Sequence, residues 1–274
     1  MASSQEVDPM WAVESTTLPS PPENSPSLIA HRGFAGEHPE NTVSAVRAAA
    51  SEADWIEIDC RPTADGDVAV FHDHRLDRLT SRTGLVAETP SEIVFETEVV
   101  DSGDTVPRLD QVLDAVPEDI GIVLDLKGRF DIASPGVEAN ENWGWIPSAL
   151  ETLSGFAHPV LVSTFWERAL SAVTDAAPEV STAFVIGEGA QQGLTVANRY
   201  DCAAIHPASH LIADTGRKRD LEQDLVARAH DSGLLVNVWS PVTRYEAGLL
   251  TSAGVDGIIS DYSDVLTPRR VLPP

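Results

Sequence analysis

Two carboxylates, Glu57 and Asp59, lie two residues apart at the end of the apolar run Trp55–Asp59. If this run is a buried strand, both side chains point the same way, because residues i and i+2 of a strand share a face. Neighbouring carboxylates repel each other unless a cation lies between them. Asp125 ends a later apolar run and can supply a third oxygen ligand. We therefore predict that these three residues bind Mg2+ or Ca2+, since no Cys or His cluster favours zinc; the alternative is that they are surface carboxylates of an acidic protein.

Five short motifs follow one another between residues 31 and 73: His31-Arg32-Gly33, Pro39-Glu40-Asn41-Thr42, Glu57-x-Asp59, Thr63-x-Asp65-Gly66 and Val70-x-His72-Asp73. In this order they resemble the signature of the glycerophosphodiester phosphodiesterase family, and five ordered motifs are far more specific than one. Three later segments are similar to the same family: Val106–Leu113, Leu124–Lys127 and Gly254–Asp261. The resemblance implies a metal-dependent enzyme that cleaves a glycerophosphodiester to glycerol phosphate and an alcohol. It also implies that the substrate's glycerol hydroxyl attacks first and forms a cyclic phosphate, which water then opens.

The two histidines in these motifs each end an apolar run, His31 after Leu28–Ala30 and His72 after Val68–Phe71. Cleavage of a P–O bond near neutral pH needs one group that takes a proton from the nucleophile and one that protonates the leaving alkoxide. Histidine suits both tasks. A single histidine at a strand end is more often structural, but two in matching motifs favour catalysis. We predict that His31 is the general base and His72 the general acid.

Three further residues are predicted to bind the substrate. The planar guanidinium of Arg32 can bind phosphate oxygens through two parallel hydrogen bonds. Lys127 follows Asp125 by two residues, so it shares a strand face with that carboxylate and adds a second cation. Trp239 matches a family position that walls the pocket. The alternative for Arg32 is a salt bridge to Glu57 or Asp59, which can coexist with phosphate binding.

Asp125 departs from the family pattern, in which this position usually holds Glu. The sequence Asp125-Leu126-Lys127 is instead similar to the sphingomyelinase D branch of the same superfamily. A phospholipase of that kind, which releases a cyclic phosphate, is therefore one alternative function. Another is a catalytically silent module that binds a phosphodiester, although the presence of both histidines argues against it.

The charge of the chain limits its partners. Lys and Arg number 18 against 43 Asp and Glu, which gives a formal net charge of −25. Such a surface repels nucleic acids and anionic membranes, so the expected partner is a small glycerophosphodiester. We interpret the excess of acids as adaptation to high salt, where ions screen the self-repulsion; the alternative is an ordinary acidic protein.

The remaining sequence features favour a cytoplasmic enzyme without stable membrane association. The N-terminus lacks a basic segment followed by an apolar stretch, so we expect no signal peptide. No apolar run approaches the roughly 20 residues that a membrane-spanning helix needs. Cys60 and Cys202 are predicted to be buried thiols rather than a disulfide.

Apolar runs alternate with helical patterns along the chain. The predicted strands are Leu28–His31, Trp55–Asp59, Ile120–Lys127, Val160–Phe165, Thr182–Ile186, Ala203–His206, Leu234–Ser240 and Gly257–Ser260. The predicted helices are Thr42–Ser51, Leu109–Ala115, Pro147–Gly155, Trp166–Ala176, Ala190–Arg199, Asp220–Ser232, Arg244–Ala253 and Ser263–Val271. Eight strands, each followed by a helix, predict an α/β fold of the (β/α)8 TIM-barrel type, with catalytic groups at the carboxyl ends of the strands.

Two segments lie outside this alternation. Residues 1–27 are polar and rich in proline, so we expect a flexible tail before a barrel domain over 28–274. Val68–His72 is predicted to form an extra hairpin strand after the turn residues Asp65-Gly66. The following insertion, about residues 75–107, is interpreted as a small cap over the active site, because long structured loops at this rim are usually functional.

Overall fold

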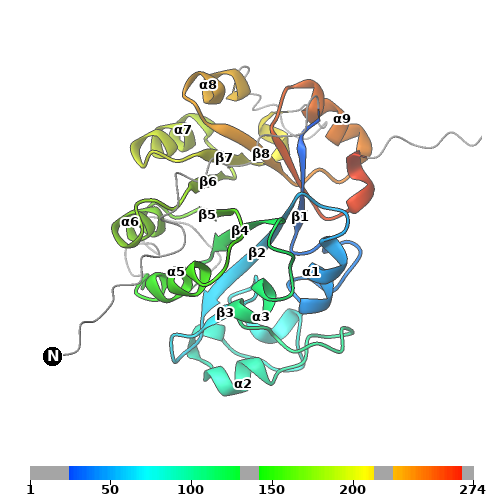
Figure 1. The fold of residues 1–274 in the computed structure, drawn as a ribbon, viewed down its shortest axis with the longest axis vertical. Coiled ribbons are helices and arrows are strands. Elements are labelled where there is room, and N and C mark those ends of the chain that lie inside the picture. The colour runs from blue at the N-terminus through cyan, green and yellow to red at the C-terminus, as the bar shows by residue number, and fades with distance from the viewer. Residues whose placement is uncertain (1–24, 130–141, 213–224, 267–274) are drawn as a thin grey trace, which may run out of the picture.

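The computed structural model describes residues 25–129, 142–212 and 225–266. Within them, eight parallel strands close into a barrel, because β1 pairs with both β2 and β9 (Figure 1). The barrel strands are β1 (Ser27–His31), β2 (Trp55–Pro62), β4 (Gly121–Leu126), β5 (Val160–Thr164), β6 (Thr182–Ile186), β7 (Ala204–Pro207), β8 (Leu235–Trp239) and β9 (Gly257–Ser260). The predicted (β/α)8 fold is confirmed, and each barrel strand coincides with one predicted run.

Helices pack around the outside of this barrel (Figure 1). They are α1 (Val43–Ala49), α3 (Leu109–Leu113), α5 (Ile146–Ser154), α6 (Glu167–Ala176), α7 (Ala190–Arg199), α8 (Leu225–Asp231) and α9 (Arg244–Ser252), followed by the 3-10 helix η5 (Ser263–Leu266). Outward-facing strand residues such as Ile56, Ile58 and Cys60 pack against them in one large apolar cluster. Parts of two predicted helices, residues 220–224 and 267–271, lie outside the described residues.

The inside of the barrel is filled by a smaller apolar layer near the amino ends of the strands. Its members are Ile29, Trp55, Val123, Leu161, Ala183, Ala204 and Ile259, each 6% exposed or less. Burial of a large apolar side chain contributes about 1.5–3 kcal/mol to folding, so this layer stabilises the barrel and excludes water from its floor. The residues of this layer come from seven of the eight strands, and two positions further along the chain the same inward face presents the next layer: His31, Glu57, Asp125, Ser163, Val185, His206 and, just after β9, Asp261.

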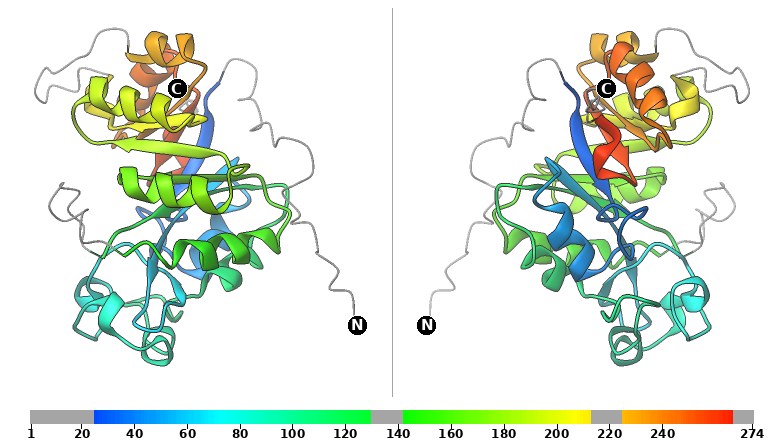
Figure 2. Two further views of the ribbon diagram at one scale, coloured as in Figure 1. Left: turned by 90° about the vertical axis from the view of Figure 1, so that its left-hand side faces the viewer. Right: turned by 90° about the vertical axis from the view of Figure 1, so that its right-hand side faces the viewer.

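The chain between β2 and β4 leaves the barrel. β3 (Val68–Val70) returns antiparallel to the end of β2, which confirms the predicted hairpin. The insertion that follows contains the 3-10 helices η2 (Leu76–Arg78) and η3 (Val86–Glu88) and the short helix α2 (Ser91–Phe95). A separate apolar cluster that includes Phe71 and Val94 holds it together. The insertion extends to one side of the barrel in both views of Figure 2.

Residues 1–24 of the predicted tail lie outside the described residues, and the last residue of its predicted range begins the first barrel strand. Ser27 already belongs to β1: it pairs with Gly257, and its backbone N–H donates to Asp256 O at 2.9 Å. A polar residue joins the strand here because its backbone, not its side chain, makes the contact. Cys60 and Cys202 are free and buried, as predicted. No helix in the described part of the chain combines the length and apolar character needed to cross a membrane.

Candidate active site

A cavity of about 690 Å³ opens at the carboxyl ends of the barrel strands. Its charged and titratable lining consists of His31, Arg32, Glu57, Arg61, His72, Asp125 and Lys127. Its apolar lining is mainly aromatic and aliphatic and includes Phe165, Trp166, Val185, Trp239 and Ile259. The structure thus brings all the residues predicted for the site to one cavity, except that Asp59 is fully buried beside it. This is the end of the barrel at which enzymes of this fold hold their active sites.

Glu57, Asp59 and Asp125 form a buried carboxylate cluster in which one oxygen of each lies within 4.8 Å of the others. Asp59 and Asp125 are paired positions on adjacent strands, and Glu57 precedes Asp59 on the same face. Burial and the charges of the two aspartates raise the pKa of Glu57 well above its usual value. The cluster could therefore hold a metal ion, whose charge would offset this repulsion.

The hydrogen bonds of the cluster fit a cation ligand set. Asp59 Oδ1 is buried and accepts no aligned hydrogen bond from any described residue; it faces the Lys127 ammonium at 2.9 Å instead. Its partner Oδ2 accepts from Asn41 Nδ2 at 2.7 Å, so the carboxylate is held in one orientation. Ser163 Oγ donates to Asp125 Oδ1 at 2.8 Å and orients that carboxylate too. The other oxygen of each aspartate, Asp59 Oδ1 and Asp125 Oδ2, pairs with the Lys127 ammonium, and hard carboxylate oxygens that attract a cation also suit Mg2+ or Ca2+.

Lys127 lies against these carboxylates. Its Nζ is 2.9 Å from Asp59 Oδ1 and also pairs with Asp125 Oδ2. Burial alone would lower the pKa of this ammonium, but the surrounding carboxylates raise it, so Lys127 stays charged. For the Asp59 carboxyl, burial alone would raise the pKa, but the positive charges of Lys127 and Arg32 hold it well below its usual value. Lys127, predicted to bind substrate, thus faces both the cavity and the carboxylate cluster.

The loop between β1 and α1 holds its backbone in an uncommon conformation. Arg32, Gly33 and Phe34 have φ values of 53°, 75° and 63°. A side chain at Gly33 would come within 2.9 Å of Ala45, so only glycine fits there. The turn directs Arg32 N–H to Glu57 Oε2 at 3.0 Å. Such strain is typical of functional sites, and here it brings the start of the loop against the carboxylate cluster.

The Arg32 side chain lies between the cavity and two carboxylates. Its Nη1 donates to Glu40 Oε1 at 2.9 Å, while its Nε lies 3.1 Å from Asp59 Oδ2 without being aligned for a hydrogen bond. Burial would lower the pKa of Arg32, but Asp59 and Glu40 raise it. Of the two salt bridges considered as an alternative for Arg32, the one to Asp59 is present, and the guanidinium still lines the cavity.

Each of the two candidate catalytic histidines has a carboxylate partner on its Nδ1. His31 Nδ1 lies 2.6 Å from Asp261 Oδ1, and His72 Nδ1 lies 2.7 Å from Asp73 Oδ1. Burial would raise the pKa of Asp261, but His31 lowers it. With the proton on Nδ1, Nε2 of the neutral ring can accept a proton at the cavity, and Nε2 of the imidazolium can donate one. His31 Nε2 lies 4.0 Å from Glu57 Oε2, beside the carboxylate cluster.

Sequence reasoning missed the orienting role of both aspartates. Asp73 directly follows His72, and Asp261 follows the apolar run of the last strand, as the other strand-end acids follow theirs. That shared placement was the available signal, because all strand ends of a closed parallel barrel meet at one rim.

The apolar lining of the cavity has a fixed shape. Trp239 Nε1 donates to His206 O at 2.8 Å, and Phe165 meets the Trp239 ring edge-on with centroids 5.7 Å apart. His206 itself is buried on the cavity floor, and Asn237 Nδ2 lies 3.2 Å from its Nε2. Burial lowers the pKa of His206 to about 3, so its imidazole is neutral near pH 7.

Comparison with known proteins finds relatives that match most of this chain. The chain is 27% identical to the glycerophosphodiester phosphodiesterase of Bacillus altitudinis, over 86% of this chain and 95% of that protein. It is 27% identical to the corresponding enzyme of Caldanaerobacter subterraneus, over 87% of this chain and 95% of the relative. A phosphodiesterase structure from Oleispira antarctica, in complex with the product sn-glycerol-3-phosphate, superposes with a TM-score of 0.74 at 25% identity, covering 89% of this chain and 97% of that one.

The family comparison covers nearly the whole barrel. The sequence model of the glycerophosphoryl diester phosphodiesterase family matches residues 31–265, from the first catalytic candidate to the end of the last described turn. This match includes every residue predicted for the site. The chain therefore belongs to the glycerophosphoryl diester phosphodiesterase family.

Proposed function

We propose that this protein hydrolyses glycerophosphodiesters to glycerol phosphate and an alcohol. The observation that carries the proposal is the meeting of three carboxylates and two histidine–carboxylate pairs at one cavity. Family membership and the relatives' names support the same reaction. A silent binding module would have no need for two oriented histidines.

Glu57, Asp59 and Asp125 are the residues that would hold a divalent metal, Mg2+ or Ca2+. Such an ion, when bound, neutralises negative charge on the phosphate oxygens. Arg32 and Lys127 line the same cavity and bind those oxygens as well. These cations offset, at short range, the repulsion between a phosphodiester and a chain of net charge −25.

The two histidines then divide the proton transfers. His31 accepts a proton from the attacking hydroxyl at Nε2, while Asp261 stabilises the imidazolium through Nδ1. His72 donates a proton from Nε2 to the departing alkoxide, and Asp73 holds its Nδ1. Trp239 belongs to the apolar lining of the cavity, where it positions the uncharged part of the substrate.

Product analysis by phosphorus NMR tests the reaction. The purified chain is incubated with glycerophosphocholine, glycerophosphoethanolamine or glycerophosphoglycerol, with and without EDTA. Glycerol phosphate that forms only without EDTA is the expected result. A cyclic phosphate as the final product would favour the sphingomyelinase D-like alternative, and no turnover of any of the three would contradict the proposal.

The cellular setting is part of the proposal. A cytoplasmic enzyme adapted to high salt accounts for the charge of −25, because ions screen the repulsion among the acids. We expect the chain to unfold at low ionic strength and to recover its fold in molar KCl. Equal stability in the two buffers would show that the acidity has another origin.

A further inference from the structure

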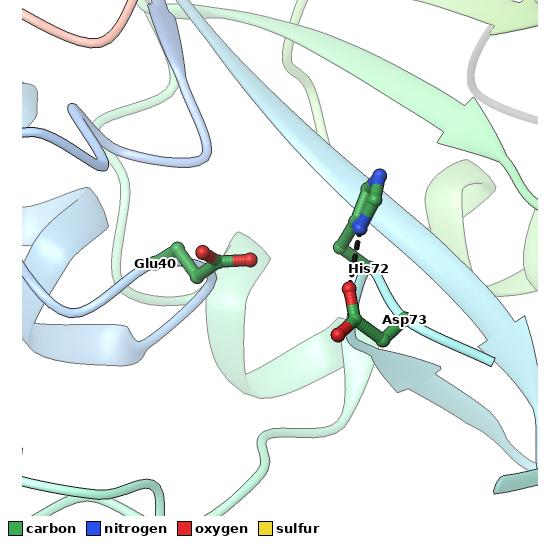
Figure 3. A group of neighbouring side chains, drawn as sticks. All are labelled: Glu40, His72 and Asp73. Atoms are coloured by element: carbon green, nitrogen blue, oxygen red, sulfur yellow. Dashed lines mark hydrogen bonds and ion pairs between the residues drawn. The ribbon is translucent and has the colours of Figure 1, made fainter. Parts of the chain in front are cut away.

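His72 and Asp73 share their surroundings with Glu40, which belongs to the loop between β1 and α1. Figure 3 shows the Glu40 carboxylate directed toward Asp73, whose own carboxylate meets the His72 ring. The ligand atoms of the three lie within 4.8 Å of one another, as in a metal site. The two carboxylates of this group, those of Glu40 and Asp73, bind an arginine of the insertion, Arg78.

Arg78 makes four hydrogen bonds to the two carboxylates. Its Nε and Nη2 donate to Asp73 Oδ2 and Oδ1 at 2.6 and 2.8 Å. Its Nη1 and Nη2 donate to Glu40 Oε2 and Oε1 at 2.8 and 2.7 Å. Both carboxylates are therefore bound by two parallel hydrogen bonds, a geometry that only a planar guanidinium provides.

The contacts of Arg78 with Asp73 and Glu40 matter more for the orientation of the two carboxylates than for the stability of the fold. The Arg78 side chain is 47% exposed, and an ion pair at such a surface contributes little to the stability of the fold. Two bidentate contacts nevertheless fix the plane of each carboxylate. Arg78 ends η2, which the fully buried Leu76 anchors in the core of the insertion, so its backbone is held as well.

Glu40 also binds Arg32, the proposed phosphate ligand. Its Oε1 accepts from both Arg78 and Arg32. A line of alternating charges thus joins the proposed phosphate ligand Arg32 to the proposed acid His72 through Glu40, Arg78 and Asp73. The two ends line the cavity, whereas Arg78 does not.

We propose that Arg78 is a positioning residue: it fixes Asp73 so that His72 Nε2 faces the leaving group, and through Glu40 it couples this orientation to Arg32. The proposal rests on the proposed function, in which His72 is the general acid. It gives the insertion a role in the reaction that does not require it to cover the cavity.

The test compares two leaving groups in an Arg78→Lys variant. Choline alkoxide needs a proton to leave and nitrophenolate does not, so misplacement of His72 slows only the first. We expect kcat on glycerophosphocholine to fall on the order of tenfold and kcat on a nitrophenyl glycerophosphodiester to change less than about threefold. The nitrophenyl rate also shows that the variant is folded. Equal losses on both substrates, or none, would overturn the proposal.

Arg75→Lys is the matched control, because Arg75 lies in the same insertion and pairs with the exposed Asp77. Arg75→Lys should leave the hydrolysis rates of both substrates unchanged. A loss equal to that of Arg78→Lys would contradict the positioning role of Arg78. Glu40→Gln should lower kcat on the choline ester and also raise KM for both substrates, since it releases Arg32 as well. A KM that stays constant would refute the coupling to Arg32.

A further variant, His72→Ala, tests whether His72 is the general acid, independently of the positioning role of Arg78. It should slow glycerophosphocholine hydrolysis about a hundredfold or more and the nitrophenyl ester far less. If His72→Ala shows this pattern and Arg78→Lys does not, only the positioning role is wrong. If His72→Ala slows both substrates equally, His72 is not the acid, and the positioning role is refuted with it.

Discussion

The buried His206 should make the fold sensitive to mild acid. It is 1% exposed, and its Nε2 lies 3.2 Å from the amide nitrogen of Asn237, a donor that suits a neutral imidazole. Burial lowers its pKa from 6.5 to about 3. Between these two pH values the unfolded chain binds a proton at this position and the folded chain does not, so stability rises with pH across the window and falls as the solution is acidified.

The magnitude follows from the same shift. A solution at pH 5 lies about 1.5 pH units below the pKa of His206 in the unfolded chain, and each unit corresponds to about 1.4 kcal/mol. Acidification from pH 7 to pH 5 should therefore lower the free energy of unfolding by about 2 kcal/mol through His206 alone. In His206→Gln, whose amide can still meet Asn237, this loss should disappear. Other groups titrate equally in both proteins, so their contributions cancel in the comparison.

Urea unfolding at pH 7.5 and pH 5, at constant high salt, measures the effect. The wild type should lose about 2 kcal/mol more than His206→Gln between the two pH values. His210→Gln serves as the control, because it leaves the buried imidazole in place and should follow the wild type. Identical pH dependence of wild type and His206→Gln would refute the assignment of a neutral, buried His206.

Further predictions concern the carboxylate cluster and the barrel floor. EDTA should abolish turnover, and Glu57→Gln should weaken metal binding on the order of tenfold or more in calorimetry; full activity in metal-free buffer would disprove the site. Asp125→Glu lengthens a proposed ligand by one methylene, so it should change metal affinity or the preference between Mg2+ and Ca2+, and unchanged values would place Asp125 outside the ligand set. Gly121→Ala brings a Cβ within 2.2 Å of the buried Trp55 ring, so urea titration should show a loss of about 1–3 kcal/mol. Gly248→Ala has open space around its Cβ and should not destabilise the chain; equal behaviour of the two variants would contradict a tightly packed floor.

The barrel and the carboxylate cluster were predictable because both follow from local patterns along the strands. Apolar runs of four to eight residues separated by helical patterns predict parallel strands, and inward positions two apart place Glu57 and Asp59 on one face. Parallel strands also end at a common rim, so Asp125 could be assigned to the same place before its register was known. The structure pairs Asp59 with Asp125 directly.

The contacts of long side chains could not be predicted in this way. The position of Lys127 on its strand indicates a cation at the cavity, but only packing decides that its ammonium meets Asp59 and Asp125. The contact of Arg78 with Glu40 joins residues 38 positions apart through an insertion without a clear period. Flexible charged side chains have many rotamers, and the choice among them depends on neighbours that no local pattern specifies.

The pairing of His31 with Asp261 joins residues 230 positions apart, one from the first barrel strand and one just after the last. All three residues of the carboxylate cluster have been synthesised once β4 is made, but Asp261, the partner of His31, is made only after the last barrel strand. During synthesis the nascent chain therefore has most of its substrate-binding groups before its proposed base is oriented. Catalytic competence should appear only when β9 closes the barrel against β1, so that activity reports completion of the fold rather than its onset.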